Sequence, residues 1–108
     1  MTGFEGKVAI VTGAASGIGL AIARDFAQQG MRVTISDIDV DRGRAVAAEL
    51  PHARFQATNL AQTEDLQRLV DETLASEGHL DILVNNAGIQ YVAPITEFPE
   101  AKWRQMIE

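Results

Sequence analysis

Short runs of apolar, β-branched residues alternate along the chain with longer stretches in which apolar residues recur every three or four positions. The short runs are typical of strands buried on both faces of a parallel sheet. They predict strands at residues 7–12, 32–37, 54–58 and 80–85. The longer stretches are typical of amphipathic helices. They predict helices at residues 17–29 and 40–50, a third before Gly78, and a last one that begins at Pro99.

Residues that favour helix ends mark the boundaries of these segments. Gly30 follows the first helix, where a left-handed terminal residue favours glycine, and Pro51 closes the second. Thr63 is the expected N-cap of the third helix, with acidic residues in the first turn after it. Residues 88–98 are expected to form a loop.

Strands that alternate with helices predict right-handed crossovers and an α/β fold. We expect a Rossmann-type, doubly wound parallel sheet with the strand order 3-2-1-4, incomplete at its far edge. The ligand crevice of such a sheet lies where the strand order reverses, here between the first and fourth strands. Beyond the fourth strand, we expect an unpaired apolar edge at Ile82, Leu83 and Val84.

Composition narrows the class of protein. The 108 residues are 46% hydrophobic, which fits one globular domain over residues 1–108. A net charge of -6 argues against a nucleic-acid or anionic-membrane partner, since both require clustered Lys and Arg. The chain has no cysteine, and its start shows no targeting segment, so a cytoplasmic location is expected. No metal site is expected, because His52 and His79 lie in separate, exposed turns.

A glycine-rich turn joins the first strand to the first helix. Gly13, Gly17 and Gly19 are spaced G-x-x-x-G-x-G, and glycines at a helix start let backbone N–H groups approach a phosphate. The alternative is a tight turn whose glycines only allow the strand and helix to pack closely.

Asp37 closes the second strand, where an acidic residue can accept hydrogen bonds from the adenosine ribose of a dinucleotide. A carboxylate there repels a 2′-phosphate, and Ser16 stands where a basic residue could have paired with that phosphate. NAD is therefore expected as the cofactor rather than NADP. The alternative is that Asp37 only caps the following helix together with Asp39 and Asp41.

Residues 12–19, Thr-Gly-Ala-Ala-Ser-Gly-Ile-Gly, and residues 85–88, Asn-Asn-Ala-Gly, together resemble the short-chain dehydrogenase/reductase family. The resemblance covers essentially the whole chain. It implies that Ser16 and Ile18 hold the pyrophosphate of NAD. It also implies that Asn86, Ala87 and Gly88 lie beside the nicotinamide ribose.

Two further positions follow from the resemblance. Asn59 stands where the family usually has an aspartate that accepts from the adenine amino group, so Asn59 and Leu60 are expected adenine contacts; a structural role for both is the alternative. Residues 88–95 are similar to bacterial D-3-hydroxybutyrate dehydrogenases, which implies that Gln90 donates to a substrate carboxylate. The alternative for Gln90 is an exposed loop amide.

The resemblance implies a catalytic Tyr as the acid-base group, a Lys that lowers its pKa and a Ser that orients the carbonyl oxygen. The Tyr-x-x-x-Lys motif is absent from these residues, since Tyr91 is followed four places on by Ile95. We therefore expect the chain to be the N-terminal part of a longer enzyme and to be inactive alone, and the resemblance implies that the full-length enzyme is a homo-oligomer, a tetramer. The expected reaction is hydride transfer between NAD and a small secondary alcohol, with 3-hydroxybutyrate as the leading candidate substrate. The alternatives are a sugar or polyol dehydrogenase of the same family and a non-catalytic NAD-binding module.

Overall fold

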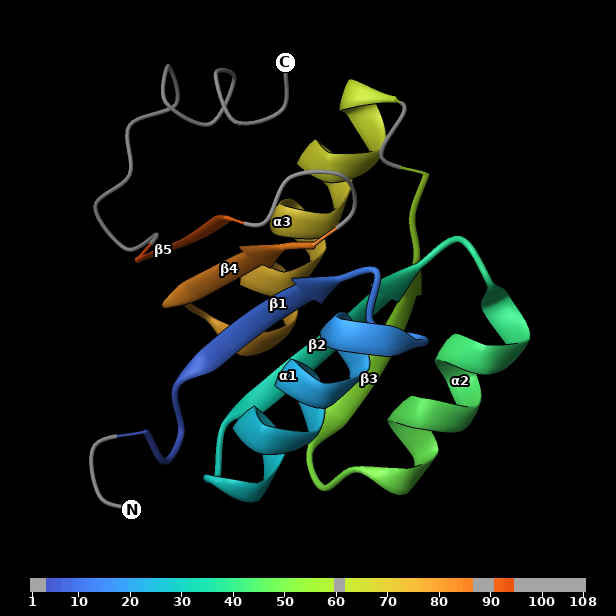
Figure 1. Cartoon of the computed structure of the whole chain (residues 1–108). Coiled ribbons are helices and arrows are strands. Elements are labelled where there is room, and N and C mark those ends of the chain that lie inside the picture. The colour runs from blue at the N-terminus through green and yellow to red at the C-terminus, as the bar shows by residue number, and fades with distance from the viewer. Residues whose placement is uncertain (1–3, 60–61, 87–90, 95–108) are drawn as a thin grey trace.

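The computed structural model describes residues 4–59, 62–86 and 91–94. Strands and helices alternate through most of this range (Figure 1). The elements are β1 (Val8–Thr12), α1 (Gly17–Gln28), β2 (Arg32–Asp37), α2 (Val40–Glu49), β3 (Ala53–Ala57), α3 (Thr63–Glu77), β4 (Ile82–Asn85) and β5 (Tyr91–Pro94).

The strands form one sheet in the order β3-β2-β1-β4-β5. The first four are parallel, and Ile10 of β1 is paired with Thr34 of β2 on one side and with Leu83 of β4 on the other. The predicted order 3-2-1-4 and the Rossmann-type α/β class are therefore confirmed.

Two layers of helices cover the sheet, with α1 and α2 on one face and α3 on the other (Figure 1). Alternate residues of the strands fill the two layers, as the period of a strand requires. Ala9 and Val11 of β1 pack with α1 and α2, whereas Val8 and Ile10 pack with α3. All five residues of β1 are buried, which explains why its sequence is apolar without alternation.

The predicted unpaired edge of the fourth strand is wrong, and so is the predicted loop at residues 91–94, while the rest of that loop lies outside the described residues. Residues Tyr91–Pro94 form β5, which lies antiparallel to β4, with Ala93 paired with Leu83. The backbone groups at the edge of β4 gain hydrogen bonds from this pairing, which an open edge would lack. The expected helix from Pro99 lies outside the described residues.

Element boundaries differ from the prediction by one or two residues. Thr63 is the first residue of α3 rather than its N-cap, and Gln62 takes the N-cap position with extended backbone angles. Both expected glycines have positive φ, 89° at Gly30 and 86° at Gly78. Their places at the ends of α1 and α3 were predicted correctly.

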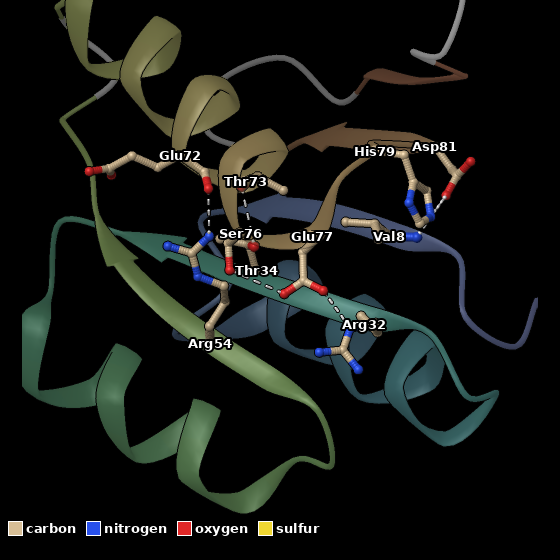
Figure 2. A network of polar contacts seen from close by, with 10 residues as sticks. All are labelled: Val8, Arg32, Thr34, Arg54, Glu72, Thr73, Ser76, Glu77, His79 and Asp81. Atoms are coloured by element: carbon tan, nitrogen blue, oxygen red, sulfur yellow. Dashed lines mark hydrogen bonds and ion pairs between the residues drawn. The ribbon is translucent and has the colours of Figure 1, made fainter.

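Polar contacts join the C-terminal half of α3 to the sheet beneath it (Figure 2). Arg32 of β2 forms an ion pair with Glu77, and the Thr34 and Thr73 hydroxyls lie 3.4 Å apart. Arg54 of β3 donates to the carbonyl oxygen of Glu72 at 3.3 Å. These contacts orient α3 across β2 and β3, beyond the apolar cluster that it forms with β1.

In the described ranges, no helix is long and apolar enough to cross a membrane.

Candidate functional site

Most of the predicted site residues come from the carboxyl ends of three neighbouring strands. The glycine-rich turn follows β1, Asp37 ends β2, and Asn86 follows β4. The chain leaves β1 toward the α1 face, whereas α3 enters β4 from the opposite face. The ends of β1 and β4 therefore form the switch point at which open α/β sheets bind ligands.

The glycines of the turn meet two different backbone requirements. Gly13 and Gly17 each have a φ of 62°, a conformation that residues with a side chain rarely adopt. Gly19 has no such angle, but a Cβ there would lie 2.2 Å from the carbonyl oxygen of Gly13. The alternative of a tight, closely packed turn therefore fits all three glycines, since Gly13 and Gly17 shape the turn and Gly19 allows the close packing.

The first turn of α1 presents its backbone to solvent. Ser16 is the N-cap residue, yet within residues 16–28 its hydroxyl makes no capping hydrogen bond. Ser16 and Gly17 are exposed, Ile18 is 59% exposed, and no residue of this fully described turn is acidic. The first N–H groups of a helix have no partner within the helix, and they carry partial positive charge. The start of α1 thus offers donors suited to an anion.

Asp37 lies against the glycine-rich turn. Its Oδ2 accepts a hydrogen bond from the backbone N–H of Ala15 at 3.0 Å, and its Oδ1 accepts one from Asp39 N–H at 3.0 Å. The N-cap of α2 is Asp39, whose carboxylate accepts from Arg42 N–H at 3.1 Å. The capping alternative is therefore wrong for Asp37 and correct for Asp39, while Asp41 lies in the first turn of α2.

The end of β4 is tied to the end of β1 by one buried hydroxyl. Thr12 Oγ1 accepts from Asn86 N–H at 2.8 Å and lies 3.0 Å from Asn85 Oδ1, to which it can donate. The Asn86 side chain donates to the carbonyl oxygen of Gly13 at 3.5 Å. These contacts set Asn86 beside the start of the glycine-rich turn.

The segment after β3 also lies beside Asp37. Thr58 N–H donates to the carbonyl oxygen of Asp37 at 3.1 Å, and Asn59 N–H donates to the Asp65 carboxylate at 2.9 Å. Asn59 is therefore positioned by the first turn of α3. Four other predicted site residues lie outside the described residues: Leu60, Ala87, Gly88 and Gln90.

Comparison with known proteins settles the family. A family model described as short chain dehydrogenase matches residues 7–108. The chain belongs to the short-chain dehydrogenase family. Members of this family are oxidoreductases, as the resemblance of residues 12–19 and 85–88 implied.

The relatives include enzymes named for sugars and polyols. L-fucose dehydrogenase of Mus musculus is 44% identical over 109 residues, covering 100% of this chain and 40% of the relative. D-threitol dehydrogenase of Mycolicibacterium smegmatis is 41% identical and covers 92% of the chain and 40% of the relative. The chain thus spans about 40% of the length of these curated relatives.

A solved structure shows the same fold. The hydroxysteroid dehydrogenase from Escherichia coli superposes with a TM-score of 0.76 at 39% identity, covering 79% of this chain and 37% of that one. This likeness agrees with the Rossmann-type sheet described above.

Sequence reasoning assigned no separate role to Thr12 or to the Ala15 N–H group in this short-chain dehydrogenase. A hydroxyl at the end of a completely buried strand was the available signal for Thr12, because buried polar groups require partners. No signal pointed to Ala15, since its backbone bond to Asp37 depends on how the turn folds over β2.

The two histidines lie away from this site. His52 is exposed and has a φ of 58°, and His79 is exposed with Nε2 3.1 Å from Asp81 Oδ2 (Figure 2). Within residues 4–59, 62–86 and 91–94, no three His, Cys, Asp or Glu side chains gather as a metal site would require.

Proposed function

We propose that residues 1–108 form the single NAD-binding domain of a longer short-chain dehydrogenase. The observation that supports this most strongly is the Asp37 carboxylate held at 3.0 Å from the glycine-rich turn, beside an uncapped helix N-terminus. An anion-binding helix start and a ribose acceptor beside it are the two recognition elements of a dinucleotide site.

The proposed binding roles follow the order of the cofactor's parts. The turn of Gly13, Ser16, Gly17, Ile18 and Gly19 binds the pyrophosphate, and Asp37 accepts from the adenosine ribose. Asn59 and Leu60 contact the adenine. Asn86, Ala87 and Gly88 lie against the nicotinamide ribose, and when bound the nicotinamide supplies the hydride acceptor.

NAD is the proposed nucleotide rather than NADP. The Asp37 carboxylate would meet the 2′-phosphate of NADP at short range, and Ser16 brings no positive charge to offset it. Titration of both nucleotides into the full-length protein tests this proposal, and we expect NAD to bind at least about tenfold more tightly. Tighter binding of NADP would refute the role given to Asp37.

A sugar or polyol is the proposed substrate class. Its support is the group of relatives named for fucose, threitol and sorbitol. A second candidate is 3-hydroxybutyrate, favoured by Gln90 and the sequence around it, since an amide can donate to a carboxylate.

Turnover of the full-length protein on L-fucose, a tetritol, sorbitol and 3-hydroxybutyrate separates the two candidates. We expect the highest kcat/KM on one of the sugars or polyols. A preference for 3-hydroxybutyrate that falls on Gln90→Ala would support the second candidate and exclude the first.

The reaction itself requires a tyrosine, a lysine and a serine that we place after Glu108. A coding sequence that continues in frame to Ser and Tyr-x-x-x-Lys supports the enzyme. A stop codon after Glu108 supports the non-catalytic NAD-binding module instead. We also propose that the full-length protein is a cytoplasmic homotetramer that acts on a small-molecule substrate and has no nucleic-acid partner.

A further inference from the structure

Two hydrogen bonds hold the glycine-rich turn to the end of β2. Ala14 N–H donates to the carbonyl oxygen of Ser36 at 3.2 Å, and Ala15 N–H donates to Asp37 Oδ2 at 3.0 Å. Ala14 and Ala15 are 0% and 3% exposed. A buried N–H group that loses its partner is costly, so these two bonds set where the turn lies.

The bond from Ala15 is the one that depends on a side chain. Ser36 contributes a backbone oxygen that every residue would provide, whereas Asp37 contributes a carboxylate. The second carboxylate oxygen is held by Asp39 N–H, so the Asp37 side chain is fixed at both oxygens. Each oxygen can accept about two hydrogen bonds, which leaves acceptor capacity for ribose hydroxyls.

We propose that Asp37 is a positioning residue for the pyrophosphate-binding turn in addition to its proposed contact with the ribose. This inference rests on the proposed nucleotide site and deepens it. The carboxylate holds Ala15, and through it the start of α1, before any nucleotide binds. Loss of the Asp37 oxygen therefore weakens binding of both NAD and NADP, whereas loss of its charge alone changes the preference between them.

Two substitutions separate these effects. Asp37→Ala and Asp37→Asn both remove the negative charge, but only asparagine retains an oxygen that can accept from Ala15. The asparagine has one oxygen for the two N–H groups of Ala15 and Asp39. We expect it to accept from Ala15, because Ala15 is buried, whereas Asp39 is exposed and its N–H group can bond to water. Asp39→Ala is the matched control, because it removes a carboxylate two positions away and leaves the Ala15 bond intact.

The first measurement is amide hydrogen exchange of Ala15 in the full-length protein without nucleotide. Asp37→Ala is expected to raise the exchange rate by about tenfold or more, since hydrogen bonds to charged groups contribute strongly. Asp37→Asn and Asp39→Ala are expected to change it by less than about threefold. An unchanged rate in Asp37→Ala, or an equal increase in Asp39→Ala, would overturn the proposal.

The second measurement is the affinity of each variant for NAD and NADP. Asp37→Asn is expected to bind NADP more tightly than Asp37→Ala by about fivefold or more, because both lack the repelling charge and only one holds the turn. Equal NADP affinities, or tighter binding by the alanine variant, contradict the positioning role. If wild-type protein binds neither nucleotide, the proposed function fails, while the exchange result for Ala15 still decides the contact.

Discussion

At the scale of single residues, two neighbouring hydroxyls at the ends of β1 and β2 have opposite surroundings. Thr12 and Ser36 are paired in the register and are both almost completely buried. The Thr12 hydroxyl bonds to the end of β4, whereas Ser36 Oγ finds no hydrogen-bond partner within the described part of the chain. A buried hydroxyl with a partner stabilises a fold, and one without a partner costs free energy.

Replacement of Ser36 by alanine is expected to leave stability unchanged or to raise it. The substitution removes a buried polar atom that has no partner and leaves the backbone oxygen bonded to Ala14 in place. The free energy of unfolding, measured by urea denaturation, should rise by up to about 1 kcal/mol. A loss of more than about 1 kcal/mol would show that the hydroxyl has a partner.

Replacement of Thr12 by valine is expected to have the opposite effect. Valine keeps the shape of threonine, but Asn86 N–H and Asn85 Oδ1 lose the hydroxyl between them. The free energy of unfolding should fall by about 1–3 kcal/mol. Nucleotide affinity should fall as well, because Asn86 loses one of the bonds that hold it beside the turn. Ser36→Ala is the matched control, and equal effects of the two substitutions would contradict the assignment.

At the scale of elements, one glycine sets the distance between α2 and β3. A Cβ on Gly43 would lie 2.0 Å from Cε1 of Phe55, so the helix packs directly on the ring. Gly43 is buried, and it stands inside a helix, where glycine is otherwise unfavourable. Close packing on the ring explains why this position contains glycine.

Gly43→Ala is therefore expected to destabilise the protein despite the better helix propensity of alanine. Overpacking costs about 1–3 kcal/mol, and propensity returns only about 1 kcal/mol. Phe55→Leu shortens the side chain that the new methyl group would meet. A double-mutant cycle should give a combined loss of stability smaller than the sum of the two single losses.

Exposed Ala45 of α2 provides the control for helix propensity. Ala45→Gly should cost about 1 kcal/mol, with no coupling to Phe55→Leu. Strict additivity of Gly43→Ala and Phe55→Leu would show that the ring does not limit the approach of the helix.

The elements predicted correctly from the sequence are those whose own residues favour their secondary structure. Strand β2 was predicted with its exact bounds, because Val33 and Ile35 are β-branched and β2 is buried between two neighbours. Strand β5 was missed, since it has only four residues, ends in Pro94 and gains its backbone partners from β4. A short edge strand depends on a distant segment, so its local pattern carries little information.

At the scale of the whole molecule, the positions of some site residues could be predicted from the sequence. These are the residues at the ends of strands, because the strand fixes where its last residue lies in the sheet. Asp37 ends β2 and Asn86 follows β4, so parallel pairing brings both to the edge at which α1 begins. The contact between Asp37 and Ala15 was not predictable, because it requires the turn to fold back over β2 by a specific path. The order of strands in the sequence therefore predicts at which edge of the sheet the site residues lie. Which of their atoms are in contact depends on how the turn packs.

The described strands form the edge proposed for nucleotide binding, but the family's catalytic motif is absent from the 108 residues. The edge at which we propose that a nucleotide binds is formed by the carboxyl ends of β1, β2, β3 and β4. The family's tyrosine and lysine have no counterpart in the 108 residues, since Tyr91 is the sole tyrosine and Ile95 stands four positions after it. On the proposed function, these residues would bind a nucleotide but lack the family's group for moving the proton of an alcohol.

We therefore expect the pure 108-residue chain to show no NAD-dependent oxidation of 3-hydroxybutyrate, sorbitol or L-fucose. Formation of reduced nucleotide, followed by its absorbance, measures this directly, with the full-length protein as the positive control. Loss of general acid-base catalysis alone costs about 100- to 10,000-fold in rate. Sustained turnover by the chain above the rate without protein would mean that another residue, such as Tyr91, can exchange the proton. Tyr91→Phe would then test whether Tyr91 is responsible.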